Sequence, residues 1–164
     1  MLQFASAQNR EVLGEYKIGI IGRDQEDTIY QAAHLGAQDA ARELSEKYSI
    51  DVELLIATPE ASQGSSQPTS LAELFIQEAD GFIISPGNSE IVASSIRFAM
   101  EGGQEVIFFE SELEGVQPMA AILADEAQAG RLAGKTILKK LPTRARVAIL
   151  TSTEPTPQLR QRLE

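Results

Sequence analysis

The stretch Phe82–Glu90, FIISPGNSE, passes in one step from apolar residues to a turn. The three apolar residues at its start are typical of a buried strand. Pro86 has no backbone N–H with which to continue a strand, and Gly87 permits backbone angles that other residues avoid. Asn88 or Ser89 can cap a following helix, whose first backbone amides then point at the end of the strand. The stretch predicts a buried strand that ends beside a site for a small polar molecule.

Apolar runs of the same kind recur along the chain and are followed by turn residues. They consist of nearly continuous Ile, Leu, Val and Phe, which is the pattern of parallel strands covered on both faces. The five runs are Lys17–Ile21, Val52–Ala57, Gly81–Ser85, Glu105–Phe109 and Arg146–Thr151, and Met119–Leu123 is a weaker sixth.

Helical patterns lie between these runs. The first covers Thr28–Tyr48, with an apolar stripe formed by Ile29, Ala33, Ala37, Ala40, Leu44 and Tyr48. The second is expected to open at the capping box Ser70-Leu71-Ala72-Glu73. The third runs from Asn88-Ser89 to the glycine pair Gly102-Gly103, and the fourth starts near Asp125.

Strands that alternate with helices predict an α/β fold, because right-handed crossovers then produce a three-layer α/β/α arrangement around a parallel sheet. Ligands of such sheets bind beyond the carboxyl ends of the strands. The expected rim is rich in carboxylates and amides, which suit polyhydroxylated ligands. A second interpretation, in which these acidic loops only solvate the surface, stays open. The rim segments are residues 22–27, 58–60 and 110–112, together with Asp125.

The composition limits the classes of partner. A chain of 164 residues has the length of one ordinary domain. Its formal net charge of −10 disfavours nucleic acid, which binds through basic surfaces. It contains no cysteine, so disulfides and Cys-based metal sites are excluded. We also expect no membrane insertion and no export signal within this sequence, because no apolar run has the required length.

Enzyme motifs are missing from the sequence. A dinucleotide site needs the pattern G-x-G-x-x-G after the first strand, whereas this chain has only Gly19, within the strand, and Gly22 after it, in the spacing GIIG. Neither a phosphate-binding loop nor a hydrolase nucleophile elbow occurs, and the single histidine, His34, falls within the first predicted helix. Paired carboxylates such as Glu110 with Glu112 have no accompanying base. We therefore predict a protein that is not an enzyme and that uses no cofactor or metal.

The order of the motifs resembles the type 1 periplasmic binding protein superfamily, in particular the ribose/galactose-type sugar-binding proteins of ABC transporters and lactose-repressor-like ligand domains. The resemblance rests on KIGIIGRDQEDTIYQAAHLGAQDAA (Lys17–Ala41), ADGFIISPGNSEIV (Ala79–Val92), EVIFFES (Glu105–Ser111), ILADEAQAGRLAG (Ile122–Gly134) and ARVAILT (Ala145–Thr151). It implies a flavodoxin-like strand order, 2-1-3-4-5.

The resemblance also implies a domain organisation. Residues 1–14 are expected to be an N-terminal extension and residues 15–124 the first ligand-binding lobe. Residues 125–164 are expected to form the hinge and the incomplete start of a second lobe, so that the chain is truncated relative to the family. In that family the ligand lies between the two lobes.

Ligand-binding residues are implied at the positions that match the family's motifs. They are Asp27, Tyr30, Ser85, Glu110, Ser111, Asp125 and Arg160. Tyr30 is expected to stack on a sugar face and Glu110 to bind hydroxyl groups. Residues 27–30 lack the proline and one of the two phenyl rings of the family's pattern, and Ser111 replaces an arginine, which argues against ribose-like specificity.

Three functional hypotheses follow. The leading one is a solute-binding protein for a small carbohydrate, working with an ABC transporter permease in the periplasm or outside the cell. The second is the effector-binding domain of a cytoplasmic sugar-responsive transcription regulator. The third is a single lobe that associates with itself, for example as a homodimer. A longer natural chain with a signal peptide would favour the first hypothesis, and an upstream helix-turn-helix the second.

Overall fold

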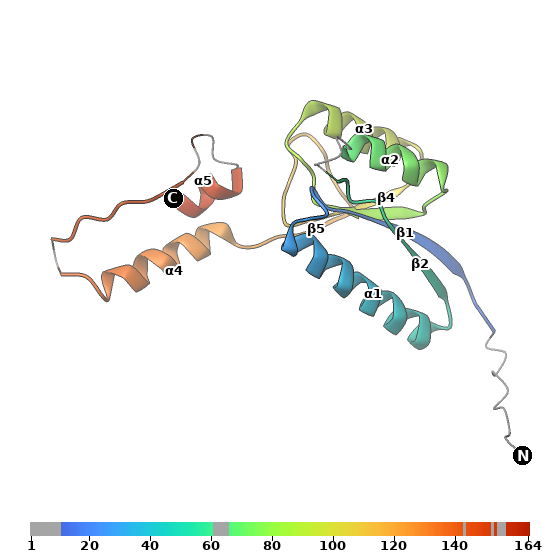
Figure 1. Cartoon of the computed structure of the whole chain (residues 1–164), viewed down its shortest axis with the longest axis horizontal. Coiled ribbons are helices and arrows are strands. Elements are labelled where there is room, and N and C mark those ends of the chain that lie inside the picture. The colour runs from blue at the N-terminus through green and yellow to red at the C-terminus, as the bar shows by residue number, and fades with distance from the viewer. Residues whose placement is uncertain (1–10, 61–65, 143, 152, 154–156) are drawn as a thin grey trace, which may run out of the picture. The chain divides into compact units, whose positions relative to one another are not determined.

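A parallel sheet lies at the centre of the first part of the chain (Figure 1). The computed structural model describes residues 11–60, 66–142, 144–151, 153 and 157–164. These residues fall into two units, one that ends at Ile122 and one that spans Leu123–Glu164. Most of the predicted N-terminal extension lies outside the described residues.

Five strands of the first unit, within the described ranges, pair in the order β2-β1-β3-β4-β5. Their bounds are β1 Glu15–Ile21, β2 Asp51–Ile56, β3 Gly81–Ile84, β4 Glu105–Phe109 and β5 Ala120–Ile122. Every pairing is parallel; at the centre, Phe82 lies opposite Gly19 on β1 and Val106 on β4. The predicted parallel sheet and its 2-1-3-4-5 order are confirmed, and the weak run Met119–Leu123 supplies β5.

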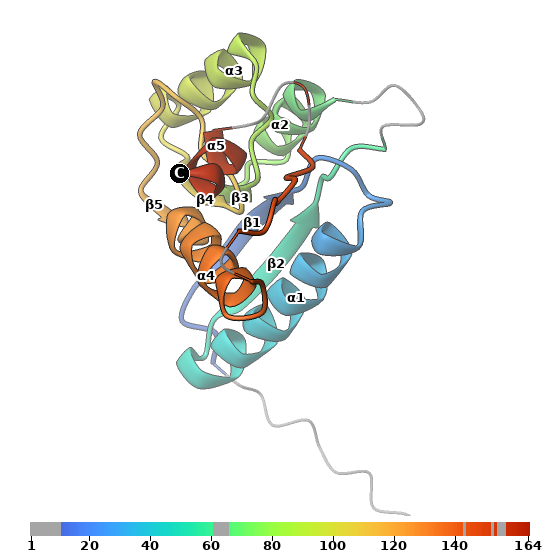
Figure 2. The same cartoon turned by 90° about the vertical axis from the view of Figure 1, so that its left-hand side faces the viewer.

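Helices cover both faces of this sheet. Helix α1, Thr28–Tyr48, lies on one face, and α2, Gln67–Ile76, and α3, Glu90–Glu101, lie on the other (Figure 1). Figure 2 shows α1 running alongside β2. The three-layer α/β/α prediction is therefore confirmed. None of the helices in the described ranges combines the length and the hydropathy that a membrane span requires.

The main core lies between the sheet and the α2–α3 layer. Alternate residues of β3 and β4 face these helices, since side chains of a strand point to its two sides in turn. The largest members of this core are Ile21, Leu71, Leu74, Phe82, Ile84, Ile96, Val106 and Phe108, each at most 3% exposed.

The predicted apolar stripe of α1 faces the sheet over part of its length, where Ala37, Ala40 and Leu44 line an apolar pocket with Ile18 and Val52, but none of its members is fully buried. The buried residues of this helix are Tyr30 and Ala41, whereas Ile29, Leu44 and Tyr48 are exposed. A helix of 21 residues is about 32 Å long, but a strand of 6 residues spans only about 20 Å. The helix therefore extends beyond the strand it covers, and apolar residues near its ends meet solvent.

The start of α2 also differs from the prediction. The helix begins at Gln67, with Ser66 as N-cap and a proline in its first turn. Ser70, expected to cap the helix, lies inside it and is buried. Pro68 favours this earlier start, because its fixed φ suits the first helical turn and its missing N–H is not needed there.

The second unit contains α4, Glu126–Leu138, and α5, Pro157–Leu163. The two helices pack closely at Gly130, where a Cβ atom would approach the carbonyl oxygen of Arg162 to 1.9 Å. Arg162 also forms an ion pair with Glu126. The predicted strand Arg146–Thr151 is not a strand, because within the described part of this unit no neighbouring strand pairs with its backbone.

Candidate ligand-binding site

Four polar side chains meet where the central strands end. Arg23 follows β1, Ser85 follows β3, and Glu110 and Ser111 follow β4. They converge because the carboxyl ends of parallel strands share one edge of the sheet. Glu110 has a φ of 64°, which lies in the left-handed region. Residues other than glycine rarely adopt this region, because it costs them roughly 1–3 kcal/mol. Its backbone N–H donates to the carbonyl of Ile122 at 3.0 Å, which helps to hold this conformation.

The Glu110 carboxylate receives several hydrogen bonds. Nη2 of Arg23 donates to both carboxylate oxygens, at 2.9 and 2.7 Å. Oγ of Ser85 donates to Oε2 at 2.6 Å, and the Tyr30 hydroxyl lies 3.4 Å from the same atom. The side chains of Arg23 and Glu110 remain 42% and 33% exposed, so this ion pair is open to solvent. A small polar molecule can therefore reach both charges.

Tyr30 lies beneath this ion pair and is only 2% exposed. Its ring packs against Gly22, where a Cβ atom would come within 2.4 Å of the ring, and meets Phe109 edge-on with ring centroids 6.1 Å apart. Its hydroxyl accepts a hydrogen bond from Nε of Arg23. The hydroxyl, not an open ring face, is the part of Tyr30 directed at the charged groups.

The two serines form the buried floor of the cluster. Ser85 is fully buried, and its Oγ lies 3.0 Å from that of Ser111. Ser111 donates to the carbonyl of Pro86 at 3.0 Å, which ties the end of β4 to the loop after β3. The structure thus brings together four of the seven predicted site residues, namely Tyr30, Ser85, Glu110 and Ser111.

The other three predicted residues occupy helix termini or an exposed helix. Asp27 is the N-cap of α1 and accepts a hydrogen bond from the Ile29 amide at 2.9 Å. Asp125 caps α4 in the same way, accepting from Gln128 at 2.8 Å, and Arg160 is exposed on α5. Asp125 and Arg160 belong to the second unit. Ligand contacts by these three residues stay predictions.

Sequence reasoning missed Arg23 and Gln67. Arg23 stood in the expected rim segment, but nothing in its sequence neighbourhood singled it out from the polar residues beside it. Gln67 is buried at the start of α2 and binds backbone groups at the ends of two strands. Because the sequence predicted that α2 starts at Ser70, Gln67 was not recognised as a residue of the first helical turn.

Burial and hydrogen bonding act on two titratable groups near the site. Burial lowers the pKa of Arg23, but the hydrogen bonds and charge interactions with Tyr30 and Glu110 outweigh it and the pKa is raised. Arg23 thus stays a cation. Burial lowers the pKa of His34, whose Nε2 lies 2.8 Å from Oγ1 of Thr58. Among the described residues, no group of three or more His, Asp or Glu side chains is arranged to hold a metal ion.

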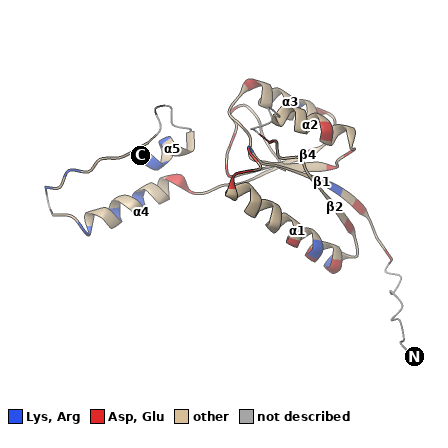
Figure 3. Cartoon of the chain, viewed as in Figure 1, with Lys and Arg blue, Asp and Glu red and all other residues tan. Residues whose placement is uncertain are grey.

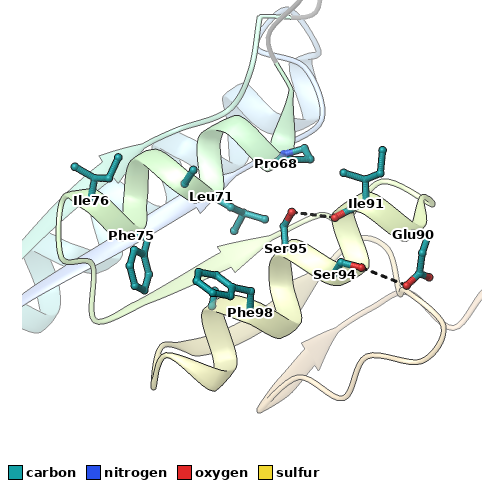
Figure 4. A pocket seen from close by; sticks show the side chains of 11 residues that line it. Pro68, Leu71, Phe75, Ile76, Glu90, Ile91, Ser94, Ser95 and Phe98 are labelled. Carbon is teal, nitrogen blue, oxygen red and sulfur yellow. Dashed lines mark hydrogen bonds between the residues drawn. The ribbon is translucent and has the colours of Figure 1, made fainter.

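A separate groove of about 660 Å³ lies between α2 and α3 (Figure 4). Phe75 and Phe98 line it with exposed rings whose centroids are 5.6 Å apart. Its serines are already bonded, Ser94 to the Glu90 carboxylate and Ser95 to the Ile91 carbonyl. Figure 3 shows acidic residues on both helices. This apolar surface does not offer the converging hydrogen-bonding groups found at the strand ends.

A five-stranded parallel sheet with polar and charged groups gathered at its strand ends is the arrangement at which α/β proteins bind ligands. Residues 18–164 match the family model described as a periplasmic binding protein domain, and the chain belongs to that family. Its strand order and flanking helices are those of the type 1 periplasmic-binding-protein fold. A comparison with curated proteins gave no significant match.

Solved structures share this fold. An ABC transporter solute-binding protein from Burkholderia multivorans is 16% identical, with a TM-score of 0.72 over 91% of this chain and 54% of its own. AraP, an arabinose-binding protein from Geobacillus stearothermophilus, is 22% identical, with a TM-score of 0.71 over 90% and 49%. The 5-methylthioribose transporter solute-binding protein from Thermotoga lettingae is 25% identical, with a TM-score of 0.59 over 76% and 37%. The chain thus spans about half or less of these relatives.

Proposed function

We propose that this chain binds a small neutral sugar or a related polyol, as part of a solute-binding protein of an ABC transporter. The observation that carries the proposal is the cluster of Arg23, Glu110, Ser85 and Tyr30 at the strand ends of a periplasmic-binding-protein fold. Similar solute-binding proteins carry tagatose and L-rhamnose in their crystal structures, which supports a carbohydrate as the ligand.

The chemistry of the cluster favours hydroxyl groups. A sugar hydroxyl both donates and accepts, so it can give its proton to the Glu110 carboxylate and receive one from the Arg23 guanidinium. Arg23 and Glu110 neutralise each other, and the adjacent loop adds Asp24, Glu26 and Asp27. An anionic ligand such as a sugar phosphate would meet excess negative charge there, whereas a neutral polyol would not.

The remaining parts of the proposal concern the whole protein. Residues 125–164 would belong to a second lobe that closes over the ligand, with Asp125 and Arg160 contributing from that side. The protein would work in the periplasm or outside the cell and deliver its ligand to a membrane permease. It would not be an enzyme: the single histidine of the sequence, His34, has Thr58 as its hydrogen-bond partner and does not pair with the serines of the cluster.

Isothermal titration calorimetry against D-tagatose, L-rhamnose, L-arabinose, 5-methylthioribose and their sugar-phosphate counterparts tests the proposal. We expect heat on addition of at least one neutral sugar and none with the phosphates. The titration should use this chain and, where the source gene continues, its full-length product. Binding of only the anionic compounds, or of none of the panel by the full-length product, would contradict the proposed ligand class.

A further inference from the structure

Gln67 connects three backbone groups at the rim of the sheet. Its Nε2 donates to the carbonyl of Gly22 at 2.9 Å and to the carbonyl of Ser85 at 2.7 Å. Its Oε1 accepts from the amide of Gly87 at 2.7 Å. The residue is 6% exposed, and both bonds donated by its Nε2 are buried. One amide thus joins the end of β1, the end of β3 and the loop after β3.

The partners fix the orientation of this amide. Two carbonyl oxygens face its nitrogen and one N–H faces its oxygen, so the flipped amide would place its oxygen against two other oxygens. Both amide protons are used. A carboxylate at this position has no proton to donate, and an apolar side chain leaves two buried carbonyls without a donor.

We propose that Gln67 is a positioning residue for the ligand-binding rim, an inference that rests on the function proposed above. Gly22 precedes Arg23 in the chain, and the Ser85 hydroxyl donates a hydrogen bond to the Glu110 carboxylate. Because its Nε2 bonds to the carbonyls of both Gly22 and Ser85, Gln67 sets the distance between the end of β1 and the end of β3 in the cluster. Gln67 itself does not touch the ligand.

Gln104 offers a matched control within the same unit. It too is a glutamine whose Nε2 donates to a backbone carbonyl, that of Ala79, at 2.8 Å. It precedes β4 and therefore lies at the amino ends of the strands, at the opposite edge of the sheet from the rim. A Gln104 variant loses one such bond, since the Oε1 of Gln104 is buried without a hydrogen-bond partner, and it leaves the rim undisturbed.

Amide hydrogen exchange by NMR, in the absence of any sugar, compares Gln67→Met and Gln67→Glu with Gln104→Met. The reporters are the amides of Gly22 and Ser85, which bond to Thr58 and Ile21 rather than to Gln67. We expect exchange at both to rise roughly tenfold or more in the Gln67 variants, since the loss of buried hydrogen bonds frees the strand ends. Gln104→Met should instead affect the amides of Asp80 and Glu105.

A second readout follows the Nε–H signal of Arg23, which is held by Tyr30. This signal should shift in both Gln67 variants and stay in place in Gln104→Met. Unchanged exchange at Gly22 and Ser85, or an equal change in all three variants, would overturn the proposal. Loss of the fold in both Gln67 variants would assign the residue to the core alone and would overturn it too.

Titration with the neutral sugars then separates this inference from the proposed function. The Gln67 variants should bind roughly tenfold more weakly than the parent, and Gln104→Met should bind like the parent. If the parent binds no sugar, the proposed function fails, while the exchange data still decide whether Gln67 positions the rim. If the parent binds and the Gln67 variants bind equally well, the positioning role is wrong and the proposed function stands.

Discussion

Arg23 and Glu110 are 87 positions apart in the chain, yet one guanidinium nitrogen of Arg23 bonds both carboxylate oxygens of Glu110, at 2.9 and 2.7 Å. The pair connects the end of β1 with the end of β4. Ser85, at the end of β3 between them, adds its own bond to the carboxylate. Three strand ends are thus held around one carboxylate.

Glu110→Gln should weaken sugar binding strongly. The substitution keeps the shape but removes the charge that Arg23 and the ligand hydroxyls share, and a hydrogen bond to a charged group contributes roughly 1.5–3 kcal/mol. Calorimetric titration measures the change. Glu112→Gln is the control, because Glu112 is two positions away and exposed. Equal binding by the parent and Glu110→Gln would remove Glu110 from the site.

Tyr30→Phe and Tyr30→Ala distinguish two roles of the tyrosine. Because the ring is buried and the hydroxyl faces Arg23, we expect Tyr30→Phe to lower sugar affinity by a factor similar to that of Tyr30→Ala. The stacking role implied by the sequence would be supported instead if Tyr30→Phe bound like the parent. Tyr48→Phe, on the exposed end of α1, should have no effect.

Gly22→Ala should destabilise the first unit by roughly 1–3 kcal/mol, because the new Cβ would press on the buried Tyr30 ring at 2.4 Å. Gly36→Ala, within α1 and with no atom in reach of its Cβ, should raise the stability by roughly 0.5–1 kcal/mol. Urea unfolding of the two variants measures both changes. Opposite signs are expected, and a neutral Gly22→Ala would contradict the close packing.

His34 should make the stability of the first unit depend on pH. Its lowered pKa means that the folded state holds fewer protons than the unfolded state between that pKa and the ordinary value of 6.5. The contribution of His34 to the free energy of unfolding should therefore be complete above this window and be lost as the pH drops through it. His34→Gln removes this contribution. Urea titrations of both proteins at about pH 7.5 and about pH 5.5 test it, and parallel losses in the two would refute it.

Gly130→Ala should separate α5 from α4 in the second unit, because the new Cβ would collide with the Arg162 carbonyl at 1.9 Å. Trypsin cleavage after Arg160 should become faster. Gly134→Ala is matched to it, since it lies one helical turn further along α4 with open space around its Cβ. Equal cleavage of the two variants would show that this helix contact does not protect α5.

Several features followed from local sequence alone. The runs before Pro86 and around Val106 predicted strands, because continuous apolar β-branched and aromatic residues are stable only when both faces are buried. Ser89 and Asp125 predicted the helix starts that the structure shows at α3 and α4. The convergence of Ser85, Glu110 and Ser111 followed from their places after parallel strands.

Other features depended on residues far away in the chain. The run Arg146–Thr151 has the composition of a strand, but a strand forms only where a neighbour pairs with its backbone. Ile29 and Tyr48 stand at the helical spacing of the apolar stripe of α1. They are nevertheless exposed, because the strands beneath α1 end before they reach them.

The sequence by itself determined the type of fold and the edge of the sheet at which polar side chains gather, because the burial and the ends of strands depend on short stretches of residues. Only the tertiary structure decided that Arg23 bonds Glu110, that Gln67 joins the ends of β1 and β3, and that Tyr30 presents its hydroxyl rather than its ring. Each of these contacts joins groups from different strands and helices. Their distances are set by the packing of the whole sheet and not by any spacing along the chain.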